Sequence, residues 1–343
     1  MPTIPADEIR EKVAAIYRAV GASVREAEVV ASLLVESNLL GHDSHGVIRV
    51  AQYVSAINSG RIKAGVETVV EKETAATAVV NGNWGFGHVT AIDAMEIAIE
   101  KAKQASIGVV TVHNCNHVGR LGAFPTIASD AGLVGLITNN GHGADKAMAP
   151  WGGVGRILPA NCLAAAFPSD KDWDVAIDLT LAVAAGGKMR VAAARGEKVM
   201  HGSVVDSEGR PSDDPEHYVS LGGALVPFGG SVAHKGSALA IAIDILSGAL
   251  SPAGCTQADP PETGNALFIQ VINVEAFQPL DNFKAEVGRF LDYLKSTPKA
   301  EGFEEILIPG ERSSRTKCVR LASGIPVEDQ TWNQIEELAD RLL

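Results

Sequence analysis

The chain has 343 residues, of which 46% are hydrophobic and 20% charged, and its formal net charge is −12. An acidic chain repels the phosphates of nucleic acids and anionic lipid headgroups, so neither is an expected partner. The four cysteines are far apart and form no C-x-x-C pair, which argues against a disulfide framework or a structural zinc site. Neither a signal-peptide pattern nor a membrane-spanning apolar run is present, so we expect a cytoplasmic protein.

The first 60 or so residues predict helices alone. Residues 6–19 place apolar side chains at helical spacing. Ser23 and Glu26 have the spacing of a capping box, which predicts a second helix that ends near Gly41. A third helix is expected over 47–58.

The middle of the chain alternates between strand and helix patterns, which is typical of an α/β fold. Strands are expected at 75–80, 108–112, 133–138, 163–167, 175–179 and 266–272, and helices at 88–104, 121–131 and 234–250. Two charged helices follow at 281–296 and 327–342. We therefore predict a helical domain from 1–72 and 278–343, and an α/β body over 73–277 that comprises one or two subdomains.

The segment 83–88 follows a predicted strand and resembles the start of a dinucleotide-binding unit, but it fails the fingerprint. Thr90 stands where the third small residue belongs, and the next strand ends in Val112-His113-Asn114 rather than in an acidic residue. If the protein binds a dinucleotide, the sequence favours a fold other than the Rossmann fold.

Asp43-Ser44-His45-Gly46 forms a polar segment between two apolar helices. Asp43 or Ser44 could cap the helix over 47–58, or the segment could belong to an active site, and the two interpretations are compatible. Arg49 and Tyr53 follow His45 at i+4 and i+8, so the three share a helix face. An arginine there could bind a carboxylate in bidentate fashion or form a surface ion pair.

His117 follows a predicted strand, where loops often carry catalytic groups. Its imidazole can exchange a proton near neutral pH, as oxidation of a hydroxyl group requires. Asn114 or Asn116 could orient the ring, and the alternative is a histidine that only satisfies local hydrogen bonds. A zinc site with His113 is the weaker interpretation.

Other strand and helix ends supply further candidates. Asn140 ends a strand near Lys146, and Asp178 ends another, where it could bind a ribose or cap a helix. The glycine-rich start of the helix over 234–250 could bind a phosphate or simply form the turn.

These segments together resemble the malate/L-lactate dehydrogenase family that lacks a Rossmann fold. The matching pieces include DSHGVIRVAQY at 43–53, NCNHVGRLG at 114–122, TNNG at 138–141, MAPWGG at 148–153, IDLT at 177–180, HKGSALAIAIDILSGALS at 234–251, PGE at 309–311 and SGIPV at 323–327. The resemblance implies a helical part built from both chain ends, a mixed sheet that binds NAD or NADP in a non-Rossmann way, and a homodimer.

The resemblance assigns the acid/base role to His117, with His45 as a second candidate and Ser44 beside it. Substrate contacts are expected from Arg49, Tyr53, Arg120, Asn140 and Lys146. Cofactor contacts are expected from Asp178, Leu179, Thr180, Lys188, Phe228, Gly229, Lys235, Gly236, Pro309, Gly310 and Glu311. The basic side chains Arg120, His142 and Lys146 leave room for a second acidic group on the substrate, and Lys188 with Arg190 favours NADP.

The leading interpretation is therefore hydride transfer between NAD(P)H and a small 2-keto acid. Reduction of a cyclic imine acid is the alternative within the family. A metal-dependent hydrolase that uses His113, His117 and His45 is the alternative from another class, and we expect no metal.

Overall fold

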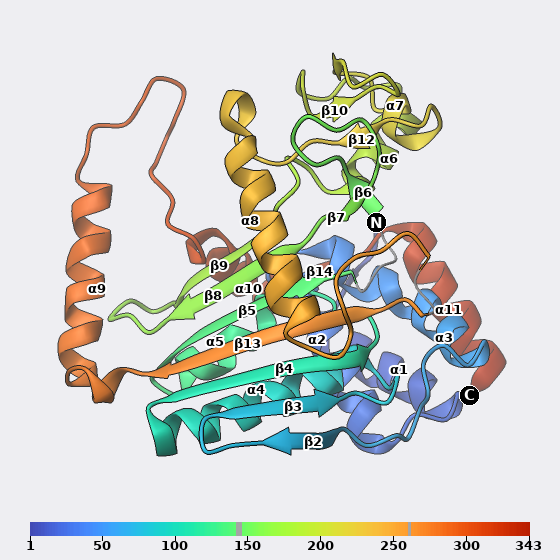
Figure 1. Cartoon of the computed structure of the whole chain (residues 1–343). Coiled ribbons are helices and arrows are strands. Elements are labelled where there is room, and N and C mark those ends of the chain that lie inside the picture. The colour runs from blue at the N-terminus through green and yellow to red at the C-terminus, as the bar shows by residue number, and fades with distance from the viewer. Residues whose placement is uncertain (142–145, 260–261) are drawn as a thin grey trace.

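A seven-stranded mixed sheet lies at the centre of the computed structural model, which describes residues 1–141, 146–259 and 262–343 (Figure 1). Its strand order is β2-β3-β4-β13-β5-β8-β9. The strands are Val69–Glu73 (β2), Thr77–Asn81 (β3), Ile107–Cys115 (β4), Asn265–Asn273 (β13), Leu133–Asn140 (β5), Cys162–Phe167 (β8) and Val175–Thr180 (β9). β3 and β4 are parallel, whereas the other neighbouring pairs are antiparallel. The predicted α/β class with a mixed sheet is confirmed.

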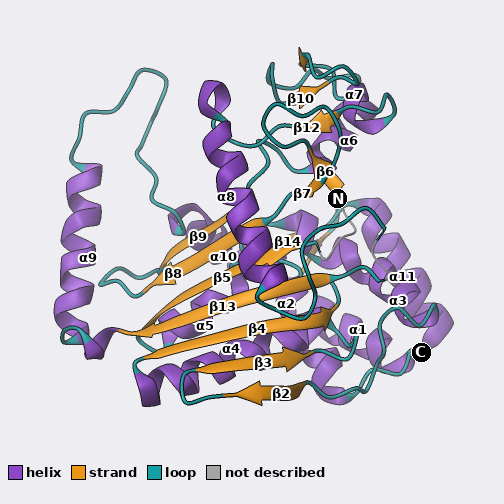
Figure 2. Ribbon diagram, in the orientation of Figure 1, coloured by secondary structure: helices purple, strands orange, loops and turns teal. Residues whose placement is uncertain are grey.

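Helices cover both faces of this sheet (Figure 2). α4 (Gly87–Ala105) and α5 (Ala123–Asp130) pack on one face, and α8 (His234–Asp244), which continues as the π-helical segment Ile245–Ala249, crosses the other. α4 can approach β4 closely because small residues face the sheet: a Cβ added at Gly108 would lie 1.9 Å from the carbonyl oxygen of Ala98.

Helices from the two ends of the chain share one hydrophobic core. α1 (Ala6–Ala19), α2 (Val24–Leu39) and α3 (Val50–Asn58) pack with α11 (Asp329–Leu342). The predicted capping box of α2 is present, with Ser23 Oγ accepting from the Glu26 amide at 3.2 Å. The short strands β1 (Thr3–Ile4) and β14 (Ile325–Pro326) pair nearby.

The other two C-terminal helices lie elsewhere. α9 (Leu280–Lys295) stands at the far edge of the molecule from α11 (Figure 1), where Lys171 pairs with Asp292 at 2.9 Å. α10 (Glu311–Ser323) returns to α2. The sequence did not predict α10. The limits of the predicted helical domain stay a prediction.

A smaller sheet, with its own core, lies beyond one end of the large sheet (Figure 1). Its order is β11-β10-β12-β6-β7, with strands Pro211–Ser212 (β11), Val204–Val205 (β10), Ala224–Leu225 (β12), Lys146–Met148 (β6) and Leu158–Pro159 (β7). α6 (Gly186–Arg195) and α7 (Glu216–Val219) accompany it. No helix in the described ranges is long and apolar enough to span a bilayer.

Candidate active site

A cavity of about 250 Å³ lies between α3 and the loop that follows β4. Its lining is mostly polar or small: Gln52, Tyr53, Ala56, Arg61, Ile62, Asn116, His117, Gly141, Thr263, Gly264 and Asn265. Two of the predicted site residues, Tyr53 and His117, therefore line the same cavity although they are 64 positions apart.

Ionisable rings cluster around this pair. The Tyr53 hydroxyl lies 2.6 Å from Nδ1 of His117. The His45 ring stacks near His117, with centroids 6.0 Å apart and planes at 19°. His88 packs edge-on against Tyr53 at 5.4 Å. The sequence did not predict a role for His88, which stands at the first position of the helix expected over 88–104.

The loop that carries His117 is fixed by the side chain of its neighbour. The Asn116 amide nitrogen donates to the carbonyls of Trp84 (2.7 Å), Gly85 (2.9 Å) and Arg61 (3.0 Å). The interpretation that Asn114 or Asn116 orients the His117 ring is therefore wrong, because these amides bind other groups and the ring is held by Tyr53. Asn114 instead adopts φ 50°, a left-handed conformation that asparagine tolerates well.

Burial controls the protonation of the cluster. It lowers the pKa of His117 well below 6.5, with further lowering by His88, Arg49 and His45. Burial also lowers the pKa of His88 to about 3 and that of His45 to about 4, and raises the pKa of Tyr53. At neutral pH the rings are uncharged, so His117 is able to accept a proton.

The segment Asp43–His45 forms a single 3₁₀ turn next to the cavity. Ser44 Oγ lies 3.0 Å from Nδ1 of His45, and Arg49 Nε donates to the Ser44 carbonyl at 2.8 Å. Arg49 also donates to Gln52 Oε1 at 2.8 Å, so it reaches the cavity wall through Gln52.

This turn does not cap the following helix, so that hypothesis is wrong. The amide of Val47 donates to Oδ1 of Asn38 on α2 (2.8 Å), which occupies the capping position. Asp43 instead accepts from Asn38 Nδ2 at 2.7 Å and from Arg320 on α10 at 2.6 and 3.1 Å. The turn Asp43–His45 is thus held between α2 and α10.

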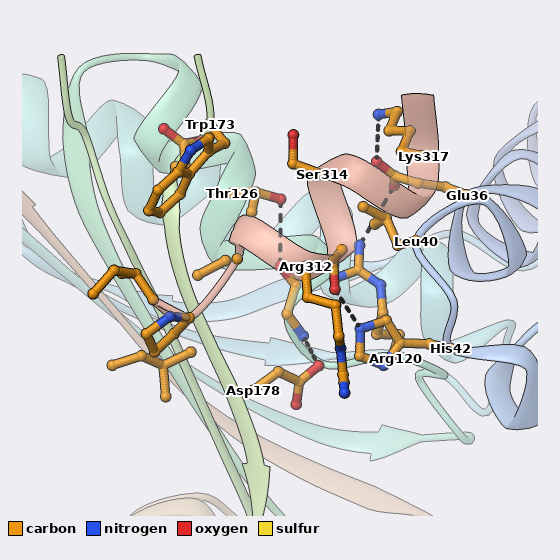
Figure 3. Close-up of a pocket in the computed structure, with 18 of the residues that line it drawn as sticks. Glu36, Leu40, His42, Arg120, Thr126, Trp173, Asp178, Arg312, Ser314 and Lys317 are labelled. Carbon is orange, nitrogen blue, oxygen red and sulfur yellow. Dashed lines mark hydrogen bonds and ion pairs between the residues drawn. The ribbon is translucent and has the colours of Figure 1, made fainter. Parts of the chain in front are cut away.

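A larger cavity, of about 800 Å³, lies between α2, β9 and the start of α10 (Figure 3). Four predicted cofactor residues line it, together with Arg120 and further charged residues: Asp178, Leu179, Pro309, Gly310, Arg120, Glu36, Arg312 and Lys317. Its volume is within the range of about 300–1,000 Å³ that small-molecule and cofactor sites occupy.

Arg120 and Asp178 are polar residues that line this cavity, and of the two only Arg120 is buried (Figure 3). Arg120 is 8% exposed and lies 3.6 Å from Glu36, while its Nε has no partner among the described residues. Asp178 accepts from the Gly122 amide at 2.7 Å, and desolvation raises its pKa. An unsatisfied donor in a buried position is a natural contact for a polar ligand.

Other predicted residues lie away from both cavities. Those that belong to the smaller sheet unit or to the start of α8 are Lys188, Phe228, Gly229, Lys235 and Gly236. Thr180 donates to the Ala160 carbonyl at 2.6 Å, and Lys146 donates to that of Ala258 at 2.5 Å.

Two further candidates point into the protein interior. Asn140 is fully buried, with its amide 3.4 Å from Asp244, and the carboxylate of Glu311 pairs with Lys295 at 2.6 Å. His142 lies outside the described residues. Neither Asn140 nor Glu311 lines either of the two cavities described above.

The histidine trio of the hydrolase interpretation is not arranged as a ligand set. His113 lies 2.9 Å from Glu71 instead of joining His117 and His45. Within the described ranges, no group of three histidine, cysteine, aspartate or glutamate side chains is positioned to hold a metal ion.

Comparison with known proteins identifies the family of the chain. Residues 4–336 match the model of the malate/L-lactate dehydrogenase family, and the chain belongs to that family. It is 36% identical to the malate/(S)-sulfolactate dehydrogenase of Methanothermus fervidus, over 99% of this chain and 98% of that protein.

Solved structures agree at the level of the fold. A malate dehydrogenase from Entamoeba histolytica superposes with a TM-score of 0.92 at 29% identity, covering 99% of this chain and 98% of that one. A delta1-piperideine-2-carboxylate reductase from Pseudomonas syringae pvar. tomato has a TM-score of 0.85 at 25% identity, covering 98% of this chain and all of that one (100%).

Proposed function

We propose that this protein is a dehydrogenase that interconverts a 2-hydroxy acid and its 2-keto acid with NAD or NADP. The observation that carries the proposal is the Tyr53–His117 pair, 2.6 Å apart in the wall of a cavity sized for a small acid. Membership of a family of malate and lactate dehydrogenases supports the reaction class.

In this proposal His117 moves the proton. Its Nδ1–H donates to Tyr53 Oη, which leaves Nε2 to accept the hydroxyl proton as the C2 hydride departs. In reduction the protonated ring returns that proton to the carbonyl oxygen. The burial that keeps His117 neutral suits it to the accepting role, with His45 and Ser44 beside it and Arg49 as the predicted clamp for the substrate carboxylate.

We assign the cofactor to the larger cavity, where Asp178, Leu179, Pro309 and Gly310 would hold it. When bound, the nicotinamide accepts or supplies the hydride. The unsatisfied Nε of Arg120 can donate to a polar or anionic group of the ligand. Five carboxylates line the same cavity together with Arg120, Arg312 and Lys317, so it is the buried Arg120 donor that supports the assignment. The lining does not discriminate NAD from NADP.

We propose a non-Rossmann mode of binding, and the position of Gly87 supports it. In a Rossmann unit a phosphate lies at the start of the first helix. Here a Cβ at Gly87 would lie 2.1 Å from the Asn116 carbonyl oxygen and 2.5 Å from that of His117, so backbone occupies the space where a phosphate would bind.

The alternative substrate, a cyclic imine acid, is favoured by one observation, the structural similarity to a piperideine-2-carboxylate reductase. Assays of 2-keto acids against cyclic imine acids with NADH and NADPH separate the two. The predicted homodimer is supported by apolar side chains exposed on α8. The cytoplasmic location stays a prediction from the sequence.

The central experiment is His117→Ala. We expect kcat to fall by about 10²–10⁴-fold, as for removal of a general base, while cofactor binding by titration is unchanged. His113→Ala is the matched control, since that ring pairs with Glu71 outside the cavity. A kcat like that of the wild type in the His117 variant would refute the assignment.

A further inference from the structure

The smaller cavity carries positive charge in an acidic protein. The chain has a net charge of −12, yet none of the described residues that line this cavity is an aspartate or glutamate. The lining includes one arginine, Arg61, in addition to His117. Local charge of this kind concentrates anions even where the whole molecule repels them.

Hydrogen bonds fix the backbone of Arg61 relative to the loop that carries His117. Its carbonyl accepts from the Asn116 amide at 3.0 Å, and the amide of the next residue, Ile62, donates to Ala56 at the end of α3 at 3.0 Å. Arg61 is therefore tied to both elements that supply the Tyr53–His117 pair, while its side chain is exposed.

The guanidinium of Arg61 makes no ion pair or hydrogen bond with another described residue. In Arg49, by contrast, Nε and Nη1 already donate to Ser44 and Gln52, so only the other terminal nitrogen has no described partner and remains for the substrate carboxylate. An unpaired guanidinium at the wall of a small cavity is suited to bidentate binding of a carboxylate or sulfonate.

We propose that Arg61 is a specificity-determining residue that binds the second anionic group of a dianionic 2-hydroxy acid. This inference rests on the proposed dehydrogenase function. In this arrangement Arg49 binds the carboxylate next to the reacting carbon, and Arg61 binds the carboxylate or sulfonate at the other end of the substrate. A monoanionic acid of the lactate type leaves Arg61 without a partner.

The test compares malate with lactate in the wild type and in Arg61→Gln, with the preferred nicotinamide cofactor. We expect kcat/KM for malate to fall about 50-fold, the worth of one lost charge-assisted contact, and that for lactate to change less than about twofold. Arg61→Lys keeps the charge and should recover part of the malate activity. Lys63→Gln removes the same charge from the same loop and should leave both substrates unaffected.

The outcomes are distinct. An equal loss for both acids would mean that Arg61 binds the first carboxylate, and no loss for either would mean that it binds neither; both results overturn the inference. Calorimetric titration of malate into the cofactor-bound protein gives a readout besides turnover, with weaker binding expected only for Arg61→Gln. If the wild type oxidised no 2-hydroxy acid, the proposed function itself would fail, and calorimetry would still report on Arg61.

Discussion

The pKa of His117 is set by its burial and by the charged and titratable groups around it. Burial lowers its pKa well below 6.5, and His88, Arg49 and His45 lower it further. A general base is active when it is unprotonated, so activity falls as the pH falls through its pKa. A base with a depressed pKa therefore stays active into the acidic range.

We expect the acid limb of kcat/KM for hydroxy-acid oxidation to lie below pH 6.5, measured across the acidic and neutral range. Arg49→Gln removes a positive charge that lowers the pKa of His117, so the limb should move to higher pH. Arg49→Lys keeps the charge and should leave the limb in place. A wild-type limb at or above the ordinary histidine value would contradict this account.

At the scale of elements, α10 connects the two cavities. Its first turns line the larger cavity, and Arg320 near its end binds Asp43 in the turn that carries His45. Both side chains retain some exposure, so the pair should contribute little to stability, about 1 kcal/mol or less. Its effect on geometry can be larger, because small displacements of catalytic groups reduce rates strongly.

Arg320→Gln should therefore lower kcat by about tenfold or more while it changes the free energy of unfolding little. Steady-state kinetics and denaturant unfolding measure the two effects on the same protein. Arg289→Gln, which breaks an exposed ion pair with Glu286 on α9, is the control and should change neither. An unchanged kcat in Arg320→Gln would show that α10 does not position the turn.

The sequence predicted elements whose signals are local. Ser23 and Glu26 mark the start of α2 because a capping box needs only residues three apart. α10 was missed because most of its side chains are polar and only Glu311 is fully buried, so no apolar periodicity arises. The large-sheet strands that the sequence predicted carry short, mostly apolar runs.

For the candidate site, too, the sequence predicted the residues that belong to local motifs. His117 and Tyr53 were identified from motifs, and they meet in one cavity. Arg61 and His88 carry no motif, since their importance depends on which distant residues face them. The role of Asn38 as a cap was hidden for the same reason: it acts across nine positions, on Val47, from another helix.

At the scale of the whole molecule, α8 and its π-helical extension expose a run of large apolar side chains. Ile241, Ile245 and Leu250 are 46%, 52% and 57% exposed. Large apolar side chains exposed together on one helix are typical of an interface when they form a continuous patch. The homodimer stays a prediction, and we propose α8 as the place of its contact.

Ile245→Glu should accordingly shift the protein towards the monomer in light scattering after size exclusion, because a charge in an apolar interface is left without a partner. Val24→Glu places the same charge on an equally exposed apolar position at the start of α2 and should leave the mass unchanged. A dimer that persists in the α8 variant, at the wild-type affinity, would place the interface elsewhere.

The position of β13 in the large sheet has a consequence for biosynthesis. This strand is contributed by residues 265–273, yet it lies between β4 and β5, which end by residue 140. While the ribosome makes the intervening 124 residues, both older strands present an unpaired edge, and such edges readily pair with other chains. The large sheet is thus completed only when a late strand inserts between two strands made much earlier, and the nascent chain is exposed to aggregation until about four-fifths of it has been made.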